Sequence, residues 1–152
     1  MTPEEYYKEY VKSLGRESEF NPEDFITDSF GDSPELADKL SALVVSGVKT
    51  ATCSSLWEYE IDGSRVPYTG LISVILDGKN EPCCIIETME ITIKKYSEVD
   101  KVFASEEGEG DLSLEYWRDA HKRYFSRTLP KIGKEFSEDM PLVCEKFKVI
   151  WK

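Results

Sequence analysis

Apolar residues recur at helical spacing in several stretches of the chain. In each stretch they fall three or four positions apart, which places them on one face of a helix. Thr2 with Glu5 forms a capping-box pattern, and Ser33 before Pro34 is a second helix-start signal. The pattern predicts helices over residues 3–14, 34–46, 97–104 and 112–126.

Other stretches have the texture of strands. They are rich in β-branched and small residues, or they alternate apolar with polar positions. We expect strands over residues 50–57, 71–76, 83–93 and 143–151, and an irregular segment over 16–32. The turn Asp77-Gly78-Lys79-Asn80 joins the second and third strands as an antiparallel hairpin.

This order of elements predicts an α+β fold. Helices lie between strands that must pair across long sequence gaps, which favours a small curved or closed β-barrel with flanking helices. A length of 152 residues fits one domain, 1–152, and the chain has no repeat or linker that would divide it.

Composition and charge limit the cellular location and the partners that we expect for this protein. No apolar run approaches the roughly 20 residues that a membrane span needs, and the N-terminus lacks the pattern of a signal peptide, so we expect a cytoplasmic protein without a membrane partner. A net charge of -11 argues against a protein that coats long nucleic acid. Basic residues are concentrated in 121–152, and a local basic face formed by them could bind an anion or a short oligonucleotide.

The sequence predicts no metal site and no cofactor. The cysteines are scattered and are expected to be buried free thiols, and a single histidine excludes a zinc site built from several imidazoles. The acidic loop 106–111 offers Glu106, Glu107, Glu109 and Asp111 as oxygen donors but lacks the spacing of a calcium loop. Capping of the next helix explains much of the loop, and whether it holds a cation stays open.

The junction from Ser46 to Thr52 is the most informative segment. A helix stops at Gly47, and Lys49 and Thr52 follow where the next strand begins. Side chains at such junctions often project into a cleft. A capped helix followed by a solvated lysine is the plain alternative.

Together with neighbouring runs, this segment resembles a known family. The spacing Gly47-x-Lys49-x-x-Thr52 is similar to the signature of the ASCH domain, a PUA-like β-barrel family. Further runs resemble its bacterial subgroup of similar length: 30–37, 56–60, 107–111, 116–118 with His121, and 136–141. The resemblance implies an ASCH core over 25–151, preceded by an N-terminal helical extension over 1–24.

The resemblance implies several activities. The family was proposed to bind RNA, one bacterial member is a ribonuclease, and a small member is an amidohydrolase that deacylates acetylated cytidine. The lysine, threonine and glutamate of that amidohydrolase fall on Lys49, Thr52 and Glu87. The tyrosine of the ribonuclease does not align clearly onto Tyr59, Tyr68 or Tyr124, and this departure from the family pattern counts against nuclease activity.

Chemistry makes the amidohydrolase trio sensible. A threonine hydroxyl becomes a nucleophile once a base takes its proton, and a desolvated lysine can be that base. Glu87 follows the apolar run 83–86. If its side chain faces the barrel interior, partial desolvation would help the carboxyl group to hold a proton and to donate it to the leaving nitrogen. Its plain alternative is the polar face of a strand.

The expected ligand is a nucleoside-sized molecule or a short single-stranded RNA. Aromatic residues can stack on a base, and arginines can contact an anion. For the aromatic residues and His121 the alternative is packing in the core, and for the arginines it is a solvated helix face. The candidate binding residues are Trp57, Glu58, Tyr59, Arg118, His121, Arg123 and Ser126. The leading hypothesis is therefore hydrolysis of an amide-type bond in a modified nucleoside; a non-catalytic RNA-binding module is the second and a ribonuclease the third.

Overall fold

The computed structural model describes residues 1–152. Its helices are α1 (Pro3–Ser13), α2 (Pro34–Val45), α3 (Leu56–Asp62), α4 (Lys101–Glu106) and α5 (Leu114–Thr128). Its strands are β1 (Ile26–Ser29), β2 (Ala51–Ser55), β3 (Ile72–Leu76), β4 (Pro82–Lys95) and β5 (Pro141–Trp151). Short 3-10 turns lie at Glu17–Glu19, Pro22–Asp24, Tyr96–Glu98 and Leu129–Ile132.

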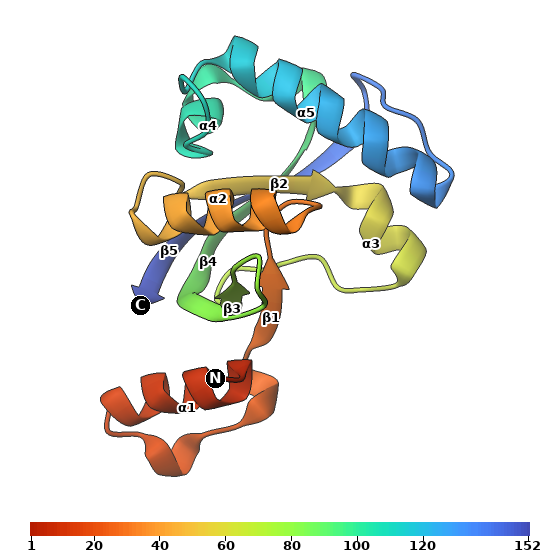
Figure 1. Ribbon diagram of the computed structural model, residues 1–152. Coiled ribbons are helices and arrows are strands. Elements are labelled where there is room, and N and C mark those ends of the chain that lie inside the picture. The colour runs from red at the N-terminus through yellow and green to blue at the C-terminus, as the bar shows by residue number, and fades with distance from the viewer.

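All five strands form one curled sheet in the order β1-β3-β4-β5-β2 (Figure 1). Strand β1 runs parallel to β3, and the other neighbours are antiparallel. The long strands β4 and β5 form the centre, which leaves β2 at an edge. The predicted α+β fold with a small curved sheet is confirmed, as is the hairpin between β3 and β4.

Helices cover the sheet in separate layers (Figure 1). Helices α4 and α5 pack on one side around Phe103, Trp117 and Leu142, helix α2 packs against the sheet through Leu40 and Val44, and α1 lies at the far end of the molecule. Helices α1, α2 and α5 each bury one apolar stripe, as their spacing predicts. None of the helices is long and apolar enough to cross a membrane.

Three segments depart from the sequence-based expectation. The helix expected over 97–104 begins only at Lys101, after a 3-10 turn at Tyr96–Glu98, because the Asp100 side chain caps α4. The strand expected through Trp57 ends at Ser55, and the next seven residues form helix α3, which Gly63 closes in a left-handed conformation with φ 73°. Within 16–32, expected to be irregular, residues 26–29 form the exposed strand β1. Backbone pairing with β3 holds this strand, so it shows no apolar alternation that a pattern could detect.

Candidate functional site

A cavity of about 210 Å³ opens where α2, β2, the acidic loop and α5 meet. Side chains from segments far apart in sequence line it, and they mix apolar walls with several charged groups. Its lining comprises Phe30, Gly31, Leu36, Lys39, Leu40, Lys49, Thr52, Cys53, Glu107, Glu109, Tyr116, Ala120, His121, Arg123, Tyr124 and Arg127. The signature lysine and threonine therefore share one hollow.

Lys49 is a fully buried cation at the floor of this cavity. Its side chain is 1% exposed, and its Nζ donates to Glu107 Oε1 at 2.9 Å and to Glu109 Oε2 at 3.3 Å. Burial alone lowers the pKa of Lys49, but the carboxylates of Glu107 and Glu109 outweigh burial and raise it. Lys49 is therefore protonated at neutral pH and is not the proton acceptor that the sequence suggested.

Gly108 allows the acidic loop to press against the Lys49 backbone. It adopts φ 73°, and a Cβ atom there would lie 2.5 Å from the Val48 carbonyl oxygen. The Thr50 amide donates to the Glu106 carbonyl at 2.8 Å, which fastens the loop to the start of β2. Only glycine fits this close approach without strain, and Glu107 and Glu109 flank it on either side.

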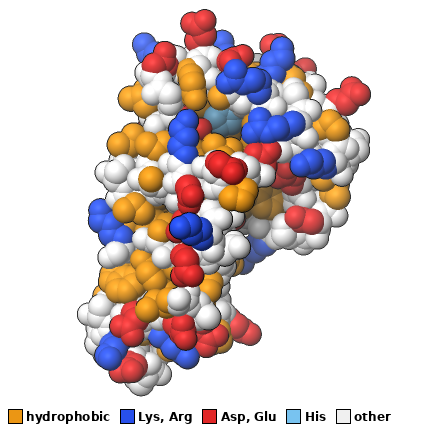
Figure 2. Space-filling model, viewed as in Figure 1, with side chains coloured by type: hydrophobic (Ala, Val, Ile, Leu, Met, Phe, Trp, Pro, Cys, Tyr) orange, Lys and Arg blue, Asp and Glu red, His pale blue; other side chains and the backbone are white.

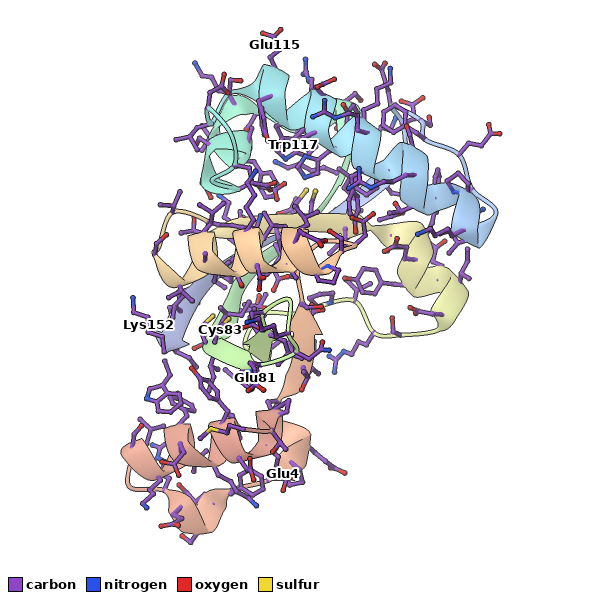
Figure 3. The ribbon with its side chains drawn as sticks, viewed as in Figure 1. Glu4, Glu81, Cys83, Glu115, Trp117 and Lys152 are labelled. Carbon is purple, nitrogen blue, oxygen red and sulfur yellow. The ribbon has the colours of Figure 1, made fainter.

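Glu107 joins the loop to helix α5. Its Oε1 accepts from Lys49, while its Oε2 accepts from Trp117 Nε1 and lies 3.2 Å from His121 Nε2. In Figure 3, Trp117 extends from α5 toward the sheet, whereas Glu115 points away from it. Burial raises the pKa of Glu107, yet Lys49 and then His121 hold it well below its usual range, so the carboxylate stays ionised.

His121 has a fixed orientation. Its ring stacks on Trp117 with centroids 4.2 Å apart, and its Nδ1 lies 2.8 Å from the Trp117 carbonyl oxygen. Burial lowers the pKa of His121, but Glu107 outweighs burial and raises it. The Cys53 thiol lies beside this pair, and the ligating atoms of Cys53, Glu107 and His121 are all within 4.8 Å of one another.

Thr52 is partly buried on edge strand β2 and lines the same cavity. Among the side-chain hydrogen bonds of the chain, none involves its hydroxyl, in contrast to the fully engaged carboxylate of Glu107. The cavity thus combines a Glu107 carboxylate whose oxygens are both hydrogen-bonded with a Thr52 hydroxyl that makes no side-chain hydrogen bond within the protein.

The structure does not bring Glu87 to this cavity. Glu87 lies on β4, opposite Ile72 of β3 and Lys148 of β5, and it is not among the lining residues. Its neighbour Ile86 packs with Phe30 on the α2 side of the sheet. Successive side chains of a strand point to opposite faces, so Glu87 faces away from Lys49 and Thr52, and the predicted trio is not assembled.

The predicted binding residues divide in the same way. His121 and Arg123 line the cavity, but the other five do not. Trp57 packs against the core, the Tyr59 hydroxyl bonds Ser54 at 2.9 Å, Glu58 is half-buried on α3, and Arg118 and Ser126 are exposed on α5. Placement on α5 follows a helical repeat, so Arg123 faces the cavity while Arg118 and Ser126 turn away.

Basic side chains surround the mouth. Figure 2 shows the single histidine in a hollow flanked by several Lys and Arg side chains. The lining contributes Lys39, Arg123 and Arg127. Arg127 makes a two-pronged ion pair with Asp32 at 2.7 and 3.0 Å, and Arg123 pairs with Asp119 at 2.9 Å.

Sequence reasoning missed the roles of Glu107 and Glu109. The sequence suggested instead that these glutamates supply oxygen ligands to a cation, or that they are acidic residues placed favourably before the N-terminus of a helix. The only local signal was Gly108, because glycine permits a positive φ and a close approach to another backbone. The sequence does not reveal that the opposing backbone belongs to Lys49, 58 residues earlier.

Comparisons with known proteins agree with this architecture. The model of the ASCH domain family matches residues 24–151. The crystal structure of an ASCH domain from Lactobacillus crispatus is 35% identical, with a TM-score of 0.90, and the match covers 99% of this chain and 94% of that one. A crystal structure of a protein from Enterococcus faecalis, assigned to the family model DUF984, is also 35% identical, with a TM-score of 0.86 and coverage of 97% and 87%. No curated protein matches the chain.

These observations define a PUA-like α+β protein with a charged cavity at the edge of its sheet. The chain belongs to the ASCH domain family.

Proposed function

We propose that this protein is a hydrolase that cleaves an amide-type bond in a small modified nucleoside of the acetylated-cytidine type. The observation that carries the proposal is the ionised Lys49, held by two carboxylates at the floor of a cavity that the free Thr52 hydroxyl also lines. A buried cation beside a hydroxyl and a carboxylate suits acyl chemistry.

The size of the cavity favours a small substrate. Pockets for drug-sized ligands span about 300–1,000 Å³, and this one holds about 210 Å³. A single nucleoside-sized group can occupy it, whereas a longer strand would lie mostly outside. A net charge of -11 also repels a phosphate chain beyond the basic rim.

The charge states assign the roles. The Lys49 ammonium donates to the Glu107 carbonyl oxygen, to Glu107 Oε1 and to Glu109 Oε2, so all three of its N–H groups are in use. It would therefore stabilise the oxyanion that forms when the substrate carbonyl is attacked through its charge, and not through a hydrogen bond. Glu109, whose side chain is 18% exposed, would take the proton from the attacking water or from Thr52 and deliver it to the leaving nitrogen. Thr52 would attack the carbonyl or hold the water, so Glu109 takes the place that the sequence gave to Glu87.

The test is release of acetate from acetylated cytidine by the purified protein. We expect Glu109→Gln and Thr52→Val each to lower kcat/KM by at least about 100-fold, because each loses a group used in proton transfer or attack. Glu115→Gln on the outer face of α5 and Thr50→Val are the matched controls, and both should retain activity. Equal turnover by all four variants, or no turnover by the unaltered protein, would refute the proposal.

Binding of short single-stranded RNA without catalysis is the second candidate. The basic rim formed by Lys39, Arg123 and Arg127 favours it, although both arginines are already paired with acids. It predicts affinity that falls steeply with added salt and that Arg123→Ala weakens. Binding that does not respond to salt would contradict this second candidate function.

We also propose that the protein is located in the cytoplasm. Its four cysteines are free thiols, which suit a reducing compartment.

A further inference from the structure

We propose that Cys53, Glu107 and His121 form a zinc site whose open position faces the cavity. The residues come from β2, the acidic loop and α5, and their ligating atoms converge within 4.8 Å. Thiolate, imidazole and carboxylate are the three ligand types that Zn²⁺ uses in proteins. The proposal rests on this cluster alone and not on the hydrolytic activity.

The hydrogen bond at Nδ1 prepares His121 as a ligand. A carbonyl oxygen can only accept, so the Nδ1 atom 2.8 Å from Trp117 O carries a proton. In the neutral imidazole this leaves the lone pair on Nε2, the atom that faces Glu107. Ligating histidines commonly donate their other ring N–H to a backbone carbonyl in this way.

The spacing of the donor atoms suits a tetrahedral ion. Zinc bonds of about 2.0–2.3 Å place neighbouring ligand atoms about 3.3–3.7 Å apart, and His121 Nε2 lies 3.2 Å from Glu107 Oε2. No donor pair in the cluster exceeds 4.8 Å, about 1 Å beyond the tetrahedral spacing.

The surrounding charges can accommodate a divalent ion. Glu107 would use Oε2 for the metal while Oε1 keeps its contact with Lys49, and Glu109 supplies a second negative charge nearby. A zinc ion would replace the proton shared between His121 and Glu107 and the proton of the Cys53 thiol. Two protons leave and two positive charges arrive, so the net charge of the cluster is unchanged.

The arrangement differs from a cysteine–histidine–glutamate triad. In a triad, the nucleophile and the carboxylate contact opposite nitrogens of the imidazole. Here the Trp117 carbonyl oxygen occupies Nδ1, so Nε2, which faces Glu107, is the only ring nitrogen left for a further partner. A thiol and a carboxylate therefore cannot contact opposite nitrogens of this ring, and the convergence of three ligating atoms within 4.8 Å fits a shared ion better than a relay of protons. Three protein ligands leave a fourth position for water.

The test is zinc binding by the full-length protein after removal of metals with a chelator. We expect one Zn²⁺ per chain in competition with a chromogenic chelator, and a sulfur-to-metal charge-transfer band when Co²⁺ replaces Zn²⁺. Cys53→Ser should abolish that band and weaken zinc binding at least about 10-fold. Cys144→Ser is the matched control, since Cys144 pairs with Cys53 in the sheet but lies outside the cluster.

His121→Gln should weaken binding as much as Cys53→Ser, and thermal unfolding of each variant without metal establishes that it is folded. Should His121→Gln fail to fold, the Cys53 and Cys144 pair decides the question. Zinc retained equally by Cys53→Ser and the unaltered protein, the absence of zinc binding, or binding of another metal in its place would each overturn the proposal. Acetate release is measured separately, so loss of the hydrolytic proposal leaves this one standing.

Discussion

Two glutamates on opposite sides of the sheet show how burial and neighbouring groups together determine the direction in which the pKa of a carboxyl group shifts. Glu107 lies on the α5 side near Cys144, and it is surrounded by Lys49, His121 and Trp117. Glu145, the next residue along β5 after Cys144, points to the other face. Its hydrogen-bond donor is the Thr88 hydroxyl.

The pKa shifts of the two groups have opposite directions. Burial raises the pKa of Glu145, with a further contribution from the negative charge of Asp28, and the Thr88 hydrogen bond offsets only part of this. For Glu107 the nearby cations reverse the effect of burial. Burial therefore does not by itself set the direction in which the pKa of a carboxylate shifts, because nearby cations can reverse its effect.

The largest expected effect comes from removing the negative charge of Glu107. Glu107→Gln leaves Lys49 buried with Glu109 as its only charged partner, and breaking a buried ion pair costs about 3–5 kcal/mol. Chemical denaturation should show this loss in the free energy of unfolding. Glu106→Gln is the control, because the ion pair of Glu106 with Lys146 is partly exposed at 3.5 Å and should cost less than about 1 kcal/mol. Similar losses in both variants would contradict the comparison.

The next largest effect tests the loop that carries Glu107. Gly108→Ala introduces a Cβ against the Val48 carbonyl at a positive φ, for which we expect a cost of about 1–3 kcal/mol. Gly63→Ala also has a positive φ but meets no atom within 4 Å, so it should cost less. Thermal unfolding of the two variants separates crowding from backbone strain, and equal losses would show that crowding contributes nothing.

A smaller effect of opposite sign is expected at Glu145. Because its pKa is raised in the folded state, ionisation opposes folding; stability is greatest below the unfolded value of about 4.5 and falls as pH rises through the folded value. Glu145→Gln should therefore stabilise the protein by less than about 1 kcal/mol at pH 7. The gain should disappear near pH 4. Melting curves at the two pH values measure it, and destabilisation at pH 7 would count against our interpretation of Glu145.

The smallest effect concerns the rim. The pKa of Asp32 is lowered by its hydrogen bond with Arg127, so this pair stabilises the fold above the unfolded pKa and loses its contribution as pH falls. Half of the Arg127 side chain is exposed, and solvent screening limits the value of the pair. Arg127→Gln should cost less than about 1 kcal/mol at neutral pH and nothing in acid. A cost of several kcal/mol, read from the same denaturation curves, would mean that Arg127 supports the core.

Local patterns predicted most of the fold. Capping signals at Thr2 and Ser33 marked helix starts that the structure confirms, and turn residues predicted the hairpin of β3 and β4. The exposed strand β1 was missed, because it exists through pairing with β3 and not through its own pattern. Helix α3 was missed because Leu56 and Trp57 follow the small and β-branched residues of β2 without a glycine or proline turn signal between them.

The site was only partly predictable for a related reason. The spacing of Lys49 and Thr52 identified one wall of the cavity, since both lie in a single local segment. Their carboxylate partner depends on tertiary contact, and the sequence could not distinguish Glu87, on a strand facing elsewhere, from Glu107 and Glu109 in a loop. The cluster of Cys53 with His121 likewise needs the packing of α5 against β2.

The separation of Lys49 and Glu107 has a consequence for synthesis on the ribosome. The two residues lie 58 positions apart, so a nascent chain exposes its signature lysine long before the glutamate that neutralises it has been made. An ammonium group cannot enter an apolar interior alone. Contacts of such range also slow folding. Because α5 supplies part of the lining, the cavity can close only after this helix has emerged.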